Sequence, residues 1–260
     1  MAESDDTEWS NPKLYGTNFE IPYNAIELFN LRKIGVFLNN MPFFQDSLFH
    51  HRLATYVDYH KIEGDIVECG VYNGMSAASF AVALNHKKNN SRIWLFDSWE
   101  GFPQTNDVKD GEVAPTLAGK IKGSLEGVKE RMSNTGFPIE DIIYRKGWFI
   151  DTFKDPLPEK ISLLHIDCDF YQSVLLSLKT FYHKVVHGGL IILDDFGAFP
   201  GCRVAFYEFC EENKIRPLIR SYDHTRIFWN KTNFVESNID HTTLMSNDWQ
   251  NYIKLSTEHP

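Results

Sequence analysis

The sequence has no excess of basic charge, and its formal net charge is -9 at pH 7. An acidic protein is repelled by polyanions, which argues against a nucleic acid or an anionic membrane surface as the partner. No uninterrupted apolar run approaches the roughly 20 residues that cross a bilayer. The first ten residues are acidic and lack the basic and apolar stretches of a signal peptide. An uncharged or cationic small molecule fits this balance better.

Closely spaced cysteine pairs are also missing. The four cysteines, at positions 69, 168, 202 and 210, include no C-x-x-C pair. Two of them lie in apolar, strand-like runs, where a free cysteine usually packs as a small core residue. We therefore expect reduced thiols in a soluble, cytoplasmic protein.

What the sequence does contain is a regular alternation of apolar strands and helices. We predict strands at 65–70, 92–97, 141–147, 161–167, 189–195, 216–220 and 226–229, and helices at 75–86, 173–187 and 204–213. Nearly continuous apolar strands that alternate with helices are typical of a doubly wound, mostly parallel α/β sheet covered on both faces. Hydrophobic residues make up 43% of the 260 residues, enough for a sizeable core.

The remaining segments flank this unit or interrupt it. Residues 1–18 are predicted to be a flexible N-terminus, and 19–62 to form two or three helices, broken near 39–42, that act as a lid or an oligomer contact. The core then spans 63–232 and leaves a C-terminal extension at 233–260. Residues 101–123 are rich in Gly, Pro, Asp and Thr, which predicts a substrate loop over 102–125.

The first predicted strand ends in a glycine turn that precedes a helix, Glu68-Cys69-Gly70-Val71-Tyr72-Asn73-Gly74. In open α/β sheets, ligands bind outside the carboxyl ends of the strands. Gly70 permits the tight turn, and Gly74 lets a ligand approach the start of the helix. The next strand ends in Asp97, which is suitably placed to accept both hydroxyls of a ribose.

The negative charge of Glu68 in this turn favours a ligand with a positively charged group over one with a pyrophosphate. The dinucleotide pattern G-x-G-x-x-G is absent, and Glu68 would repel a pyrophosphate but attract an ammonium group. We therefore favour S-adenosylmethionine (SAM) over NAD, with Tyr72, Ser98 and Trp148 as further cofactor contacts. Alternatively, Glu68 is a strand-end acid bonded to local amides, and Trp148 and Phe149 pack in the core instead of against adenine.

Acidic residues close the fourth and fifth predicted strands. Asp167 and Asp169 follow one strand, and Asp194 and Asp195 follow the other. In the strand order 3-2-1-4-5-7-6 of SAM-binding sheets these strands are neighbours, so Asp167, Asp194 and Asp195 should meet. Three carboxylates repel one another unless they share protons or hold a cation.

Oxygen ligands of this kind suit Mg²⁺ or a similar hard ion. A substrate hydroxyl bound to the ion has a lowered pKa and is held in line with a methyl donor, which gives Asp167 and Asp194 catalytic importance. The alternative is that some of these acids cap the following helices, and Asp169 and Asp195 are the best candidates for that.

At these residues the chain resembles the macrocin O-methyltransferase family, the TylF/MycF type of metal-dependent sugar O-methyltransferases, over about residues 64–230. The matching pieces are Glu68-x-Gly70-Val71-x-x-Gly74, Phe96-Asp97-Ser98-x-x-Gly101-Phe102-Pro103, Lys146-Gly147-Trp148-Phe149-x-x-Thr152, His165-Ile166-Asp167-x-Asp169-x-Tyr171, Gly188-Gly189-x-x-x-x-Asp194-Asp195-x-Gly197 and Gly201-Cys202-Arg203-x-Ala205. The chain departs from the usual form at Cys168 and Phe170.

The resemblance implies a Rossmann-like class I methyltransferase fold with a seven-stranded sheet. It also implies SAM, Mg²⁺ held by Asp167, Asp194 and Asp195, a sugar hydroxyl of a natural product as acceptor, and a homo-oligomer. A phenol or catechol acceptor, a nucleotide-linked oxidoreductase and a non-catalytic SAM-binding module remain as alternatives. No general base is assigned. His165 is interpreted as a core residue within its strand, and the histidines at 50, 51, 183 and 187 as helix-surface residues.

Overall fold

The sheet at the centre of the protein has the strand order that the sequence predicts. A computed structural model describes residues 23–84 and 91–232. Its seven strands are ordered β3-β2-β1-β4-β5-β7-β6. Strands β1 to β5 run parallel to one another, and β7 runs antiparallel to both β5 and β6. The bounds are β1 Asp65–Cys69, β2 Ile93–Asp97, β3 Ile142–Lys146, β4 Ile161–Ile166, β5 Val185–Leu193, β6 Arg220–Ser221 and β7 Ile227–Asn230.

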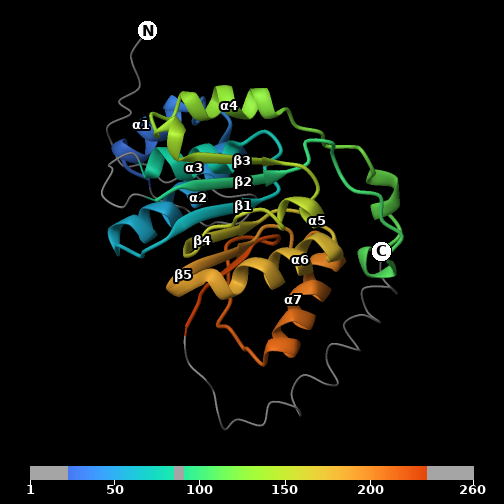
Figure 1. The fold of residues 1–260 in the computed structure, drawn as a ribbon. Coiled ribbons are helices and arrows are strands. Elements are labelled where there is room, and N and C mark those ends of the chain that lie inside the picture. The colour runs from blue at the N-terminus through green and yellow to red at the C-terminus, as the bar shows by residue number, and fades with distance from the viewer. Residues whose placement is uncertain (1–22, 85–90, 233–260) are drawn as a thin grey trace.

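Helices cover both faces of this sheet (Figure 1). On one face lie α1 (Ala25–Lys33), α2 (Met41–Tyr59), α3 (Met75–Ala83) and α4 (Leu125–Ser133); on the other lie α5 (Phe149–Thr152), α6 (Tyr171–Phe181) and α7 (Pro200–Asn213). Successive strand residues point to opposite faces, so Ile66 packs in the first layer and Val67 in the second. Burial on both faces explains why these strands are apolar throughout.

Several element boundaries agree with those predicted, but the strand expected at 216–220 is only Arg220–Ser221, and the helix expected at 173–187 ends at Phe181. The break near residue 40 is real, because α2 begins at Met41 with a proline in its first turn. The α7 helix also begins earlier than predicted, at Pro200, and β5 begins at Val185. The short helices α4 and α5 were not predicted. The segments 1–18 and 233–260, and the predicted helix end at 85–86, lie outside the described residues.

None of the helices in the described ranges has the length and apolar character needed to cross a membrane.

The close approach of β1 and β4 shapes the site. Gly70, directly after β1, has a φ of +90°, and a Cβ atom there would lie 1.7 Å from the carbonyl oxygen of Asp167. Only glycine tolerates this conformation and this distance. The glycine turn after β1 is therefore pressed against the acidic end of β4.

This contact predicts that Gly70→Ala lowers the free energy of unfolding by more than about 3 kcal/mol, from backbone strain and overpacking together. Gly35→Ala is the matched control, because Gly35 has a φ of +80° with nothing within 4 Å of the added Cβ. The control should lose only about 1–2 kcal/mol. Denaturant unfolding of both variants measures the difference, and equal losses would refute the role assigned to the β1–β4 contact.

Candidate active site

A cavity of about 630 Å³ opens at the carboxyl ends of the parallel strands. This size is within the range of small-molecule sites. The glycine turn, the end of β2 and the segment after β4 contribute its walls, together with residues 101–103 of the predicted substrate loop. Among the described residues, none from α1 or α2 lines it. The described residues of α1 and α2 therefore contribute no wall to this cavity, and the lid or oligomer contact expected of residues 19–62 stays a prediction.

Five of the seven predicted cofactor residues line this cavity: Gly70, Tyr72, Asp97, Ser98 and Trp148. The Asp97 carboxylate accepts hydrogen bonds from the backbone N–H groups of Val71 (2.7 Å) and Tyr72 (2.9 Å), and from that of Trp99. Asp97 thus holds the glycine turn in shape at the cavity wall.

Glu68 and Gly74 lie elsewhere. The Glu68 side chain is fully buried; it accepts hydrogen bonds from the Ser76 hydroxyl and from Nδ1 of His165, the latter at 2.9 Å. A Cβ on Gly74 would meet the Val128 side chain of α4 at 3.0 Å, so the glycine makes room for that helix. Neither residue is part of the cavity wall.

The predicted acidic cluster forms beside this cavity. Asp167, Asp194 and Asp195 each present one carboxylate oxygen, and these oxygens lie within 4.8 Å of one another. Burial, with repulsion from Asp194 and Asp195, raises the pKa of Asp167 well above its usual value. Burial and the charges of Asp169 and Asp194 likewise raise the pKa of Asp195. The surroundings therefore do not offset the repulsion that these carboxylates would exert on one another if all of them were ionised.

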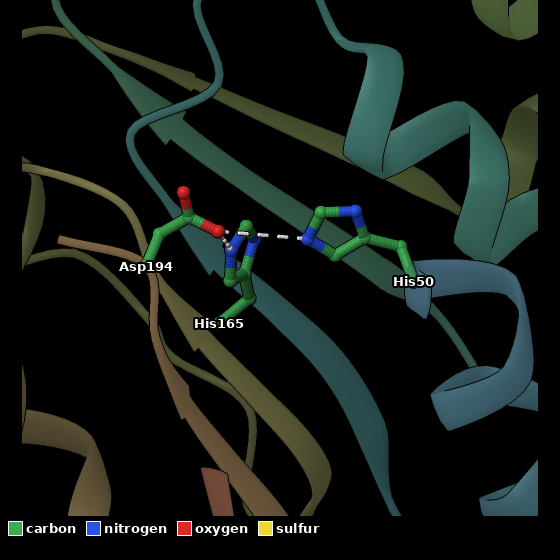
Figure 2. Close-up of side chains that lie close together, drawn as sticks. All are labelled: His50, His165 and Asp194. Carbon is green, nitrogen blue, oxygen red and sulfur yellow. Dashed lines mark hydrogen bonds and ion pairs between the residues drawn. The ribbon is translucent and has the colours of Figure 1, made fainter. Parts of the chain in front are cut away.

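Asp194 differs from its neighbours because basic side chains surround it. Its Oδ1 atom accepts a hydrogen bond from Nε of Arg226 at 2.8 Å and lies 3.3 Å from Nε2 of His165. Nε2 of His50 is 3.7 Å away, beyond hydrogen-bonding distance (Figure 2). Burial opposes ionisation, yet hydrogen bonding from His165, with His50 and Arg226 close by, holds the pKa of Asp194 well below its usual range.

His165 is buried between two acids. Burial favours the neutral ring, but hydrogen bonds to Asp194 and Glu68 outweigh it and raise the pKa of His165 to about 10. The interpretation of His165 as a core residue is correct for its position, but its ring connects two carboxylates. The pattern of the sequence contained a signal for this, since Glu68 and His165 occupy corresponding positions in adjacent strands.

The interpretation of His50 and His51 as surface residues is wrong. They are only 5% and 4% exposed, because α2 is covered on two sides. The His50 ring packs 4.9 Å from the His165 ring on β4, and Nε2 of His51 contacts the Asn30 side chain of α1 at 3.2 Å. His183 and His187 are exposed as expected.

The helix-capping alternative for Asp169 and Asp195 is also wrong. Neither α6 nor α7 has a side-chain cap from its N-cap residue. Instead, the buried Asp110 of the predicted substrate loop accepts a 2.6 Å hydrogen bond from the backbone N–H of Tyr171, the first residue of α6. The Thr105 hydroxyl donates to the other Asp110 oxygen at 2.8 Å. This contact, which the sequence analysis missed, docks the loop onto α6 beside the cavity.

The strand order β3-β2-β1-β4-β5-β7-β6 with an antiparallel β7 is that of the Rossmann-like class I methyltransferase fold, and the cavity lies at the carboxyl edge of this sheet. The profile of the macrocin-O-methyltransferase (TylF) family matches residues 48–231. The chain belongs to this family and is an O-methyltransferase.

Characterised relatives and a solved structure agree with this assignment. The chain is 28% identical, over 66% of its length and 67% of the relative, to 8-demethyl-8-(2,3-dimethoxy-alpha-L-rhamnosyl)-tetracenomycin-C 4'-O-methyltransferase of Streptomyces olivaceus. It is 28% identical to mycinamicin III 3''-O-methyltransferase of Micromonospora griseorubida, over 66% of this chain and 70% of that one. The O-methyltransferase NovP aligns with a TM-score of 0.68 and 25% identity, over 73% and 80% of the two chains.

The docking of the loop predicts the effect of Asp110→Ala. Because the substitution leaves the buried N–H of Tyr171 without its acceptor, the free energy of unfolding should fall by about 1–3 kcal/mol. Trypsin should also cleave faster after Lys109, Lys120 and Lys122. The control is Glu212→Ala on α7, which removes only an exposed ion pair with Lys179. Unchanged protection of the loop in Asp110→Ala would show that this contact does not anchor it.

Proposed function

We propose that this enzyme transfers a methyl group from SAM to a hydroxyl of a sugar, or of a small molecule that carries one, beside a bound divalent cation such as Mg²⁺. The observation that carries the proposal is the cluster of Asp167, Asp194 and Asp195, with oxygens within 4.8 Å, at the edge of a cavity. Relatives whose names specify a rhamnosyl tetracenomycin and a mycinamicin substrate support a sugar-bearing acceptor.

The cofactor would lie along the wall made by Gly70, Tyr72, Asp97, Ser98 and Trp148. Trp148 is 41% exposed, which leaves its ring available to stack on a base. SAM supplies a methyl group on a positively charged sulfur, and transfer breaks that carbon–sulfur bond as a carbon–oxygen bond to the acceptor forms. The products are the methyl ether, the neutral thioether S-adenosylhomocysteine and the proton of the acceptor hydroxyl, which passes to solvent.

The residues of the acidic cluster fit a hard cation. The Asp195 Oδ2 atom is buried and has no hydrogen-bond partner among the described residues. The cluster and Asp169 together place four carboxylates against two basic side chains, His165 and Arg226, and Arg226 is shared with Asp46 and Asp223. A divalent cation there would balance this charge and lower the pKa of an acceptor hydroxyl.

The rest of the cavity suits a sugar or glycoside. Phe102, Pro103, Ile121 and Leu176 provide apolar surface, which can pack against the carbon face of a pyranose or an aglycone. Gln172, in the first turn of α6, adds a side chain that can hydrogen-bond to hydroxyl groups. An apolar wall with a few polar groups is the usual composition of a small-molecule site.

The acceptor class is tested by incubating the enzyme with SAM, Mg²⁺ and a panel of sugars, glycosides and catechols, with the added methyl group detected by mass spectrometry. We expect methylated glycosides, no product in excess EDTA, and recovery when Mg²⁺ is restored. Turnover of catechols without turnover of sugars would refute the acceptor. Full turnover in EDTA would refute the role of the metal.

Asp195→Asn tests the cation site without altering the cavity wall. Because the ionised Asp195 is repelled by its neighbours, the amide should raise the melting temperature of the metal-free protein. Its affinity for Mg²⁺ and its turnover should each fall at least about 100-fold, while its affinity for SAM stays near that of the wild type. The exposed Asp151→Asn is the control. Calorimetry and initial rates measure these effects, and normal metal affinity in Asp195→Asn would contradict the assignment.

A further inference from the structure

We propose that His165 is a positioning residue that orients Asp194 for the cation, and that Glu68 holds His165 in place instead of binding the cofactor. This inference rests on the cation site of the proposed function. It assigns roles to two residues that lie outside the cavity wall.

The three side chains come from adjacent strands in matching register. His165 on β4 pairs with Glu68 on β1 and with Ile192 on β5, two residues before Asp194. Residues that pair in register on neighbouring strands project from the same face of the sheet. Glu68, His165 and Asp194 therefore form a row across β1, β4 and β5, beneath α2 and α3.

The row is rigid and shielded from water. Glu68 and His165 are fully buried, and the Phe80 ring of α3 packs edge-on against the imidazole at 5.6 Å. The Nδ1 atom lies 2.9 Å from a Glu68 oxygen, and Nε2 lies 3.3 Å from Asp194 Oδ1. Because both ring nitrogens have a carboxylate partner, the ring cannot turn without losing a buried hydrogen bond.

This arrangement selects which Asp194 oxygen is available to a cation. Oδ1 is engaged by His165 and by Nε of Arg226. Figure 2 shows the second oxygen directed away from both histidines. Fixing one oxygen of a ligating carboxylate presents the other in a defined direction, and partners that do so in metal sites strongly affect affinity.

His165 is better suited to this role than the other buried histidine near Asp194. Nε2 of His50 is 3.7 Å from Asp194 Oδ1 and has no hydrogen-bond partner among the described residues. His50 therefore packs against the row without fixing the carboxylate. Arg226 shares its guanidinium with Asp46 and Asp223, so it neutralises charge over several acids.

Two amide substitutions separate the two hydrogen bonds of His165. The amide of Gln reaches the position of Nε2 and retains a donor for Asp194, whereas that of Asn reaches the position of Nδ1 and retains a donor for Glu68. The control is His51→Gln, which replaces a buried histidine of α2 that contacts Asn30 and not Asp194. Each full-length variant is titrated with Mn²⁺ and followed by electron paramagnetic resonance, and SAM affinity is measured by calorimetry.

We expect His165→Asn to weaken Mn²⁺ binding by about 10–100-fold, the usual effect of removing such a partner. His165→Gln should bind Mn²⁺ several-fold more tightly than His165→Asn, and His51→Gln should match the wild type. SAM affinity should stay within a few-fold throughout. Unchanged Mn²⁺ affinity in His165→Asn, or equal losses in the Asn and Gln variants, would overturn the positioning role.

Glu68→Gln provides an independent variant if His165→Asn does not fold. It keeps an acceptor for His165 but removes the charge, so Mn²⁺ affinity should fall while SAM affinity is retained. Loss of SAM affinity with normal Mn²⁺ affinity would return Glu68 to the cofactor site and overturn the inference. Absence of Mn²⁺ binding by the wild type would overturn the proposed cation site itself, which distinguishes the two failures.

Discussion

Mutual repulsion among buried carboxylates is the constraint on which the site depends. The parallel strands β4 and β5 end side by side, which brings Asp167, Asp194 and Asp195 together in a poorly solvated place. Among the described residues, the basic side chains of His165 and Arg226 offset part of the cost of gathering these charges where they contact Asp194. The pKa values of Asp167 and Asp195 remain raised, so ionising all three carboxyls together is costly, and a cation bound among them would offset that cost.

The N-terminal helices support the acidic cluster through an ion pair, although none of their described residues lines the cavity. Arg226, just before β7, makes ion pairs with both Asp194 and Asp46 of α2, each at 2.8 Å. The hydroxyl of Tyr222 donates to the carbonyl of Gln45 in the same helix. The α2 helix thus braces the arginine that stabilises the acidic cluster. This is a different contribution from the lid expected for residues 19–62, a role that stays a prediction.

Short sequence patterns predicted those parts of the structure that depend on residues close together in the sequence. Apolar runs ending in acids predicted the strands, and the strand order of SAM-binding sheets then predicted the meeting of Asp167 with Asp194, because parallel strands end at one edge. Contacts between segments far apart in the sequence have no short residue pattern of this kind, so they were not predicted. The hydrogen bond between Glu68 and His165 was not predicted, because the two residues are 97 positions apart in the sequence. The burial of His50 depends on α2 being covered on two sides, and Asp110 docks on a helix 61 positions later.

In this fold, the residues that would hold the cation are different from those that would contact the rest of the acceptor. A cation held by Asp167, Asp194 and Asp195 would activate any hydroxyl that reaches it, so it cannot by itself select an acceptor. Selection must come from surfaces such as Phe102 and Ile121, which belong to the loop that Asp110 docks onto α6. A docked loop gives a preformed wall and lowers the entropic cost of binding. Changes in that loop can therefore alter the acceptor while the strand ends, which hold the proposed cation site, stay the same.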